Sequence, residues 1–320
     1  MPRGRRFAMI VCFVANPSID KLFEVERLVP GGIHRPAVFV QTAGGKGLNV
    51  ARAAHTLGAD VRAAGILGGH AGKWLEEALE GEAIRGSFVW TDGETRSSLS
   101  VAGRERADLT EFYERGSAVS VAVWASSLEA VGGLFEPGRW LTISGSLPPG
   151  APEDGYHALV ERARAARMRV ALDTHGEYLR RTLPAGPDIV KVNATEAGEL
   201  LGVPTASSDD SMAAGARIRD LAGGMGHAGV VTRGSEGAVV AAPDGTRYEG
   251  VLSERGRYPV GSGDAFLAGL VVALERSWDW PSALRLALGA AGANAQIPGA
   301  GRLDPARAEE LADRAEVREL

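Results

Sequence analysis

The sequence predicts an open α/β sheet of parallel strands, and three observations support this. Short apolar, β-rich runs alternate with longer segments rich in Ala, Leu, Glu and Arg. Each short run ends in Gly, Asn, Asp, Ser or Thr, which is typical of a buried strand entering a turn. With 320 residues, the chain can form one large domain, or a core with a smaller appendage. Strands that alternate with helices pair in parallel through right-handed crossovers, and such sheets carry their sites at the carboxyl ends of the strands.

The elements follow in chain order. Strands are predicted at residues 7–15, 61–67, 140–144, 170–173, 189–191 and 229–232. Helices are predicted at residues 48–57, 72–79, 153–167, 194–201, 212–222 and 267–274. Residues 16–40 and 88–118 break the alternation, because they lack helical periodicity and hold short alternating pieces. The residues leave open a small second sheet over the site or surface loops, with a slight preference for loops.

Composition excludes several classes of protein. The net charge is −5, with 35 basic and 40 acidic residues spread along the chain, which is not a nucleic-acid footprint. Cys12 is the only cysteine, so no intrachain disulfide forms and a reducing cytosol is indicated. Arg5 and Arg6 precede the apolar run 7–15, but the run is short and lacks a cleavage site. No stretch approaches the roughly 20 apolar residues of a membrane helix. We therefore expect a cytoplasmic protein without nucleic-acid or membrane partners.

The strongest chemical motif is VGSGD at residues 260–264, which directly precedes a predicted helix. Glycines before a helix let the backbone turn tightly and point N–H groups at an anion, and the helix dipole adds to this effect. Asp264, in the first turn, stays ionised and can accept the proton of an attacking hydroxyl. Taken alone, it could equally be an ordinary N-capping aspartate. The sequence has no G-x-x-x-x-G-K-[ST] P-loop, and the third glycine of the dinucleotide fingerprint is missing.

Two further motifs begin predicted helices. The first is GGKGLN at residues 44–49, where Asn49 could hold a sugar hydroxyl and Lys46 a phosphate. Its alternative is a tight turn with a solvated lysine. The second is KVNATE at residues 191–196, where Asn193 and Glu196 share a helical face and suit water-mediated Mg²⁺. Its alternative is a helix cap.

Together these motifs resemble those of the PfkB (ribokinase-like) carbohydrate kinases, from about residue 8 to residue 315. In the family's order they are GGKG at 44–47, GSLPPG at 145–150, KVNATE at 191–196, TRGSEG at 232–237 and GSGD at 261–264. The resemblance implies a doubly wound, mostly parallel sheet flanked by helices, with a small β-sheet lid. The core would comprise residues 1–15, 41–87 and 119–320, and the lid residues 16–40 and 88–118.

The resemblance also implies roles for single residues. Asp264 would be the catalytic base, and Gly261, Ser262 and Gly263 would form the anion hole. Substrate would be bound by Asp20, Gly44, Gly45, Lys46, Asn49, Arg96 and Ser146. ATP would be bound by Lys191, Asn193, Thr232, Gly234, Gly237 and Asn294, with Glu196 reaching Mg²⁺ through water. An exposed apolar face on the lid would be buried by pairing two lids in a homodimer.

The motifs NPSID at 16–20, GGKG at 44–47 and GETR at 93–96 look nearest the branch that acts on phosphorylated ketohexoses. This branch includes 1-phosphofructokinases, tagatose-6-phosphate kinases and minor 6-phosphofructokinases. The predicted function is therefore ATP-dependent phosphorylation of fructose 1-phosphate, tagatose 6-phosphate or fructose 6-phosphate. A substrate that already carries a phosphate needs fixed cations, which Lys46 and Arg96 would supply, with Arg35 as a more remote candidate.

The sequence departs from the family in four places. Tyr258-Pro259 stands where many members have Asp-Thr. The change removes a carboxylate and a hydroxyl, which argues against a monovalent-cation site of the family type. Val192 replaces the usual Pro, and His34 stands where phosphoketohexose kinases often have Asn. Residues 102–110 are charged and irregular, which predicts a different lid edge.

Two other functions stay open. The first is the same chemistry on an unphosphorylated sugar or nucleoside, for which charge-neutral substitutions of Lys46 and Arg96 would leave activity nearly intact. The second is a non-catalytic sugar or nucleotide sensor on a kinase scaffold. The intact Asp264 argues against a sensor, whereas the altered pair Tyr258-Pro259 keeps it open.

Overall fold

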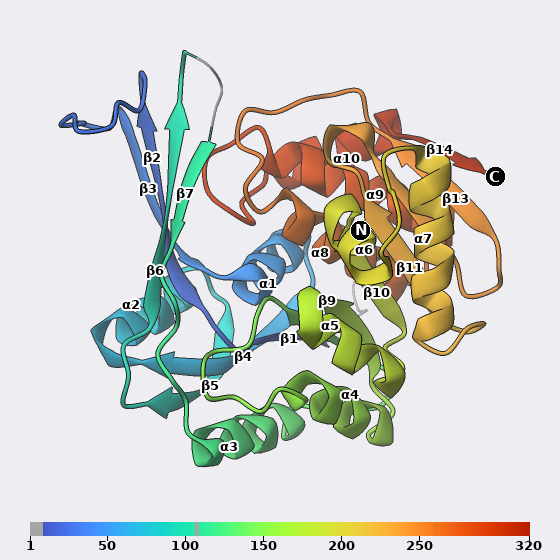
Figure 1. Ribbon diagram of the computed structural model, residues 1–320, viewed down its shortest axis with the longest axis horizontal. Coiled ribbons are helices and arrows are strands. Elements are labelled where there is room, and N and C mark those ends of the chain that lie inside the picture. Colours follow the sequence, from blue (N-terminus) through green and yellow to red (C-terminus); the bar gives the residue numbers. More distant parts are fainter. Residues whose placement is uncertain (1–8, 106–108) are drawn as a thin grey trace, which may run out of the picture.

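The computed structural model describes residues 9–105 and 109–320. In this part of the chain the strands form a ten-stranded and a four-stranded sheet (Figure 1). The large sheet has the order β14-β13-β12-β11-β10-β9-β8-β1-β4-β5. Its strands are β1 Met9–Val14, β4 Asp60–Gly68, β5 Arg85–Thr91, β8 Trp140–Ser144, β9 Arg169–Asp173, β10 Ile189–Asn193, β11 Ala228–Thr232, β12 Ala238–Ala241, β13 Arg247–Val251 and β14 Glu316–Glu319.

Helices cover both faces of the large sheet, and each face has its own apolar core. One core contains residues of α1 Lys46–Thr56, α2 Gly69–Gly81, α8 Ser262–Glu275, α9 Trp280–Asn294 and α10 Pro305–Arg314. The other contains residues of α3 Val121–Gly132, α4 Gly155–Ala165, α5 Gly176–Thr182, α6 Ala194–Leu201 and α7 Ser208–Leu221. From β11 through β5 all neighbouring strands are parallel. The predicted doubly wound fold is confirmed. No helix among the described residues is long and apolar enough to span a membrane.

All six predicted strands lie in the large sheet, although residues 7 and 8 of the first are outside the described residues. The antiparallel strands β12 to β14 were not predicted. Neither was β5, whose residues 88–91 were assigned to the small sheet. They instead pair in parallel with β4, Phe88 opposite Gly65 and Thr91 opposite Gly68. As an edge strand, β5 is only half-buried, so its sequence alternates instead of forming one apolar run.

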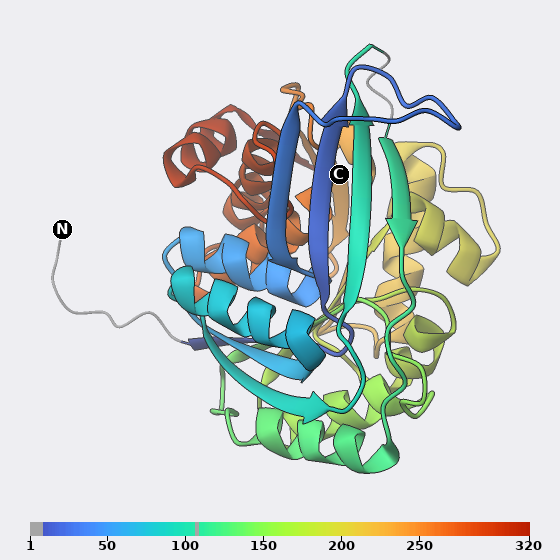
Figure 2. The ribbon, with the colours of Figure 1, turned by 90° about the vertical axis from the view of Figure 1, so that its left-hand side faces the viewer.

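The four-stranded sheet has the order β3-β2-β6-β7 and stands beside the core (Figure 2). Its strands are β2 Ser18–Val25, β3 Val38–Gly44, β6 Arg96–Gly103 and β7 Leu109–Tyr113. Residues 41–44 were assigned to the core, but they end β3 and pair with β2. The sequence left a sheet or loops open for these stretches, and a separate small sheet is present. Residues 106–108 of the irregular edge lie outside the described residues.

Candidate active site

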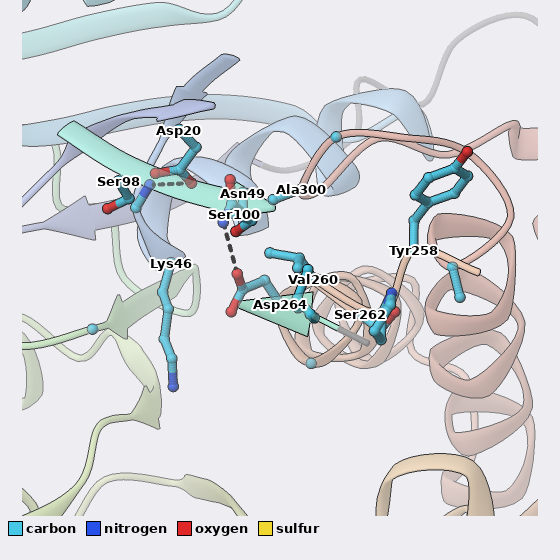
Figure 3. Close-up of a pocket in the computed structure, with 18 of the residues that line it drawn as sticks. Asp20, Lys46, Asn49, Ser98, Ser100, Tyr258, Val260, Ser262, Asp264 and Ala300 are labelled. Carbon is cyan, nitrogen blue, oxygen red and sulfur yellow. Dashed lines mark hydrogen bonds between the residues drawn. The ribbon is translucent and has the colours of Figure 1, made fainter. Parts of the chain in front are cut away.

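A cavity of about 1100 Å³ lies between the small sheet and the carboxyl ends of the core strands. It exceeds the roughly 300–1,000 Å³ of a pocket for one ligand, so two substrates can lie in it together. The small sheet contributes Asp20, Ser98 and Ser100, while the core contributes Lys46 and Asp264 (Figure 3). The site thus lies where a doubly wound sheet places it.

Asp264 is the third residue of α8, directly after the turn formed by the glycine-rich motif. Gly261 caps the helix with a φ of 81°, and a Cβ there would lie 2.7 Å from the Ala300 Cα, so the position requires glycine. Asp264 is 6% exposed and accepts a 2.8 Å hydrogen bond from Asn49 Nδ2. Burial raises the pKa of Asp264 to about 6, against the attraction of Lys46. A carboxylate with this pKa suits a general base near neutral pH.

Asp173, at the end of β9, holds Lys46 and Lys191, and the sequence motifs do not predict it. Its buried carboxylate accepts hydrogen bonds from Lys46 Nζ at 2.9 Å and from Lys191 Nζ at 2.7 Å. Burial works to raise the pKa of Asp173, but the two ammonium groups hold it below its usual range. A Cβ on Gly263 would lie 3.0 Å from Lys191 Nζ. Asp173 therefore holds the Lys191 ammonium group beside the glycine-rich turn at residues 260–263, called the anion turn below, and the Lys46 ammonium group within electrostatic reach of Asp264.

Burial works to lower the pKa of Lys46, but Asp173, Asp264 and Glu196 together raise it above its ordinary value. Lys46 Nζ lies 3.8 Å from Glu196 Oε1. Lys46 is therefore a permanent cation whose partners lie on the side of β9 and α6. The sequence assigned it to the substrate, and that assignment remains a prediction.

Asn193 and Glu196 form a capping box at the start of α6. Glu196 N donates to Asn193 Oδ1 at 2.8 Å, and Asn193 N donates to Glu196 Oε2 at 2.8 Å. The helix-cap alternative thus describes the structure, but it uses only one oxygen of Glu196, while Oε1 lies near Lys46. Mg²⁺ needs few protein ligands, because it keeps several waters and takes oxygens from the substrate phosphates. Glu196 Oε1 fits such an ion, although no cluster of three His, Cys, Asp or Glu suited to a metal occurs in the described residues.

Asp20, on β2, lies against the glycine turn that begins α1. It accepts hydrogen bonds from Ser18 Oγ at 2.5 Å and from Gly45 N at 3.2 Å. A Cβ on Gly44 would lie 2.1 Å from Asp20 Oδ2, which explains the glycine. Burial raises the pKa of Asp20. Gly44 therefore packs behind the carboxylate, whereas Asp20 and Gly45 line the cavity.

Arg96 and Ser146 lie at the same end of the cavity and meet at Asn16. Arg96 Nη2 donates to the Asn16 carbonyl at 3.3 Å, and its Nη1 donates to Ser98 Oγ at 3.2 Å. Asn16 Nδ2 donates to Ser146 Oγ at 3.4 Å. Burial lowers the pKa of Arg96, against the attraction of Asp20. The predicted substrate residues of the lid and of the GSLPPG motif are thus brought together.

The residues predicted for the nucleotide fall into two groups. Thr232, Gly234 and Gly237 line the cavity beside Asn193. Asn294 was assigned to the same pocket, but it is fully buried and not among the residues that line the cavity. Its Nδ2 donates to the Val260 carbonyl at 2.9 Å and to Ser262 Oγ at 3.2 Å. Asn294 therefore supports the anion turn from behind.

Arg52 is a second residue that the motifs do not predict. It is 5% exposed and donates to Glu82 Oε2 at 2.7 Å, to Asn49 Oδ1 at 3.4 Å and to the Ala300 carbonyl at 3.1 Å. A further 2.5 Å hydrogen bond reaches the Ala43 carbonyl on β3. Because an arginine only donates, it keeps Asn49 Oδ1 on its own side and turns the amide NH₂ toward Asp264.

A family model described as pfkB family carbohydrate kinase matches residues 11–307. The chain belongs to this family. The 1-phosphofructokinase of Bacillus subtilis (strain 168) is 28% identical over 287 residues, which cover 90% of this chain and 92% of that protein. The phosphofructokinase-2 of Escherichia coli in complex with substrates and products superposes with a TM-score of 0.88 and 26% identity, covering 96% of this chain and 99% of that one.

The ribokinase of Arabidopsis thaliana complexed with ribose and ATP superposes with a TM-score of 0.72 and 21% identity. It covers 95% of this chain and 98% of that one, and it shows the shared fold. As a pfkB kinase, the protein is a sugar kinase that transfers a phosphoryl group from ATP to a hydroxyl group.

Proposed function

We propose that this pfkB kinase phosphorylates a ketohexose phosphate with ATP and releases a ketohexose bisphosphate and ADP. The observation that carries the proposal is the arrangement around Asp264, whose buried carboxylate has a pKa of about 6. It lies after a glycine turn at a helix N-terminus, with Lys46 and Lys191 within electrostatic reach. The name of the B. subtilis relative, 1-phosphofructokinase, supports fructose 1-phosphate as the first substrate to test. Tagatose 6-phosphate and fructose 6-phosphate are the other two.

We assign the two substrates to opposite ends of the cavity. The sugar lies under the small sheet. There Asp20 accepts a hydrogen bond from one sugar hydroxyl and Asn49 donates one to another, while Arg96 faces the phosphate that the sugar already carries. ATP lies over the ends of β10 and β11, near Asn193 and Gly234. Asp264 lies between these two ends, because it contacts Asn49 and follows the turn that packs against Lys191.

In the proposed reaction the sugar hydroxyl oxygen attacks the γ-phosphorus in line with the bond to the β-phosphate oxygen, which leaves with ADP. The hydroxyl proton passes to Asp264. The N–H groups of Gly261 and Gly263 and the ammonium group of Lys191 stabilise the charge on the transferring group. The Ser262 N–H, which the sequence also assigned to the anion hole, is already bonded to the Pro259 carbonyl. Mg²⁺, held through water by Glu196, would neutralise charge on the phosphates. The small sheet excludes water, which limits ATP hydrolysis.

We infer that two copies pair through the outer face of the small sheet. On this face Phe39 is 58% exposed and Phe112 is 55% exposed, and the Phe23 and Phe39 rings lie 5.5 Å apart. Helix α2 packs against β3 at one end of the sheet, and in Figure 2 the middle of the four strands is turned toward the viewer with no described element in front of it. Contiguous exposed apolar side chains favour association. Light scattering with substrate should give the mass of a dimer for the native protein and of a monomer for Phe39→Asp. A monomeric native protein would contradict this inference.

A second candidate is the same reaction on an unphosphorylated sugar. One observation favours it: Lys46 is already paired with Asp173, and Arg96 already donates to Asn16 and Ser98. Both predicted phosphate ligands therefore already have partners within the protein. For this candidate, Lys46→Met and Arg96→Met would leave the KM of the sugar unchanged. For a phosphosugar, Arg96→Met should raise it at least tenfold, because a charged hydrogen bond to phosphate is lost.

The deciding measurement is ADP release with Mg–ATP against fructose 1-phosphate, fructose 6-phosphate, tagatose 6-phosphate, fructose, ribose and adenosine. Asp264→Asn is the control for the base. Turnover of one phosphosugar that is lost in the variant supports the proposal. Turnover of unphosphorylated compounds alone selects the second candidate. Nucleotide binding without turnover of any compound would instead indicate a sensor.

A further inference from the structure

Two of the departures from the family meet at one buried carboxylate. Glu24, on β2 of the small sheet, is only 1% exposed. Arg104, in the charged edge that follows β6, places Nε 2.7 Å from Glu24 Oε1. Tyr258, in the pair that replaces Asp-Thr, donates its hydroxyl to Glu24 Oε2 at 2.8 Å. A buried carboxylate is costly unless it is paired, so this position requires both partners.

Tyr258 belongs to the segment of residues 252–261, which links β13 to the anion turn. Its N–H donates to the Ala295 carbonyl at 2.8 Å, and Ser262 N donates to the Pro259 carbonyl at 3.1 Å. The Tyr258 ring is turned away from Asp264 (Figure 3). Its backbone is therefore joined to the core while its hydroxyl is joined to the small sheet. Burial and the hydrogen bond to Glu24 raise the pKa of Tyr258, so the hydroxyl keeps its proton and remains a donor.

We propose that Tyr258 is a positioning residue that couples the small sheet to the anion turn. The hydrogen bond from Tyr258 to Glu24 holds β2 over the sugar and, through Pro259, holds residues 260–263 in the conformation that receives the transferring phosphoryl group. This inference rests on the proposed function for its kinetic consequences, whereas the coupling itself concerns the ligand-free protein as well.

Three variants test the coupling by kinetics. Tyr258→Phe removes only the hydroxyl, Glu24→Gln removes the carboxylate charge, and the double variant removes both. We expect each single variant to lower kcat about tenfold, the loss of one hydrogen bond to a buried charge, with the KM of ATP within twofold. The kcat of the double variant should be no lower than that of the less active single variant, because the two residues act as one unit. Tyr248→Phe, on β13 of the core, is the matched control and should behave as the native protein.

A second measurement is independent of the substrate. Hydrogen exchange in the ligand-free protein should become about tenfold faster in residues 260–264 of Tyr258→Phe, and in β2 as well, but not in Tyr248→Phe. Equal exchange in both variants, or losses in kcat that multiply in the double variant, would overturn the proposal. If Glu24→Gln does not fold, Tyr258→Phe and its exchange still decide the matter. If the native protein turns over no phosphosugar, the proposed function fails, while the exchange result still reports the coupling.

Discussion

Replacing Asn49 with alanine should move the acidic limb of the kinase's pH profile upward. Asp264 must be ionised to accept the hydroxyl proton, so kcat should fall as the pH drops through its pKa of about 6. Asn49 Nδ2 donates to Asp264 Oδ2 at 2.8 Å, which stabilises the ionised form and lowers the pKa. Asn49→Ala removes this hydrogen bond and therefore raises the pKa.

The size of the shift follows from the type of bond. A hydrogen bond to a charged group contributes about 1.5 kcal/mol, and one pKa unit corresponds to about 1.4 kcal/mol. The limb should therefore move by about one unit, from about pH 6 to about pH 7. The assay is kcat at saturating ATP and sugar, measured from pH 5 to 9 at constant ionic strength. Working with kcat reports the enzyme–substrate complex, so weaker sugar binding does not disturb the result.

A matched variant separates this effect from a general loss of stability. Ser127→Ala also removes a buried hydrogen bond, to the Trp124 carbonyl within α3, far from the cavity. It should leave the limb at about pH 6. An unmoved limb in Asn49→Ala, or one that moves to lower pH, would refute the assignment of Asp264 as the base that Asn49 stabilises.

Three further outcomes follow from the same contacts. Arg52→Met should move the acidic limb upward as Asn49→Ala does, because Asn49 loses the donor that orients its amide. Arg169→Met, which breaks a remote ion pair with Glu275, should leave the limb unmoved. The pH profiles of kcat distinguish the two variants. Asp264→Asn should abolish transfer yet raise Tm most at pH 8, less at pH 5 and not at all below about pH 4, since the folded protein disfavours the ionised carboxylate once the pH exceeds the unfolded pKa of about 3.9, and fully above the raised pKa of about 6; calorimetry across this range checks the sign. Exchanging K⁺ for tetramethylammonium should change kcat less than twofold, because Pro259 has no side-chain oxygen and the Tyr258 hydroxyl is bonded to Glu24; a large K⁺ activation would contradict this.

The sequence predicts the parallel half of the large sheet because buried parallel strands are continuous apolar runs. β8, for example, was predicted with the bounds that the structure gives. The edge elements carry weaker signals. β12 has four residues, two of them alanine, a composition that does not distinguish strand from helix. β5 alternates because only one side of it is covered, and alternation is equally the pattern of a small exposed sheet.

The residues of the candidate site likewise fall into those that the sequence predicts and those that it does not. Asp264, Lys46 and Asn193 belong to local motifs, since glycines or a capping box surround them at helix starts. Asp173 has no such neighbours, and its partners Lys46 and Lys191 lie 127 and 18 residues away. Its role is set by the strand order, which places the end of β9 next to those of β8 and β10. Single residues of this kind become visible only once the strands are arranged.

Asp173 also influences the pKa of Asp264. Its removal should therefore shift that pKa in the direction opposite to the shift expected for Asn49→Ala. Burial is the largest cause of the raised pKa of Asp264, and the negative charge of Asp173 adds to it, whereas Lys46 and Lys191 lower it. Asp173→Asn removes the negative charge that opposes ionisation of Asp264, while Lys46 and Lys191 still favour it. The pKa of Asp264 should fall, and the acidic limb of kcat should move below pH 6 while that of Asn49→Ala moves above it. Shifts of the same sign in the two variants would mean that Asp264 is not the group that the limb reports.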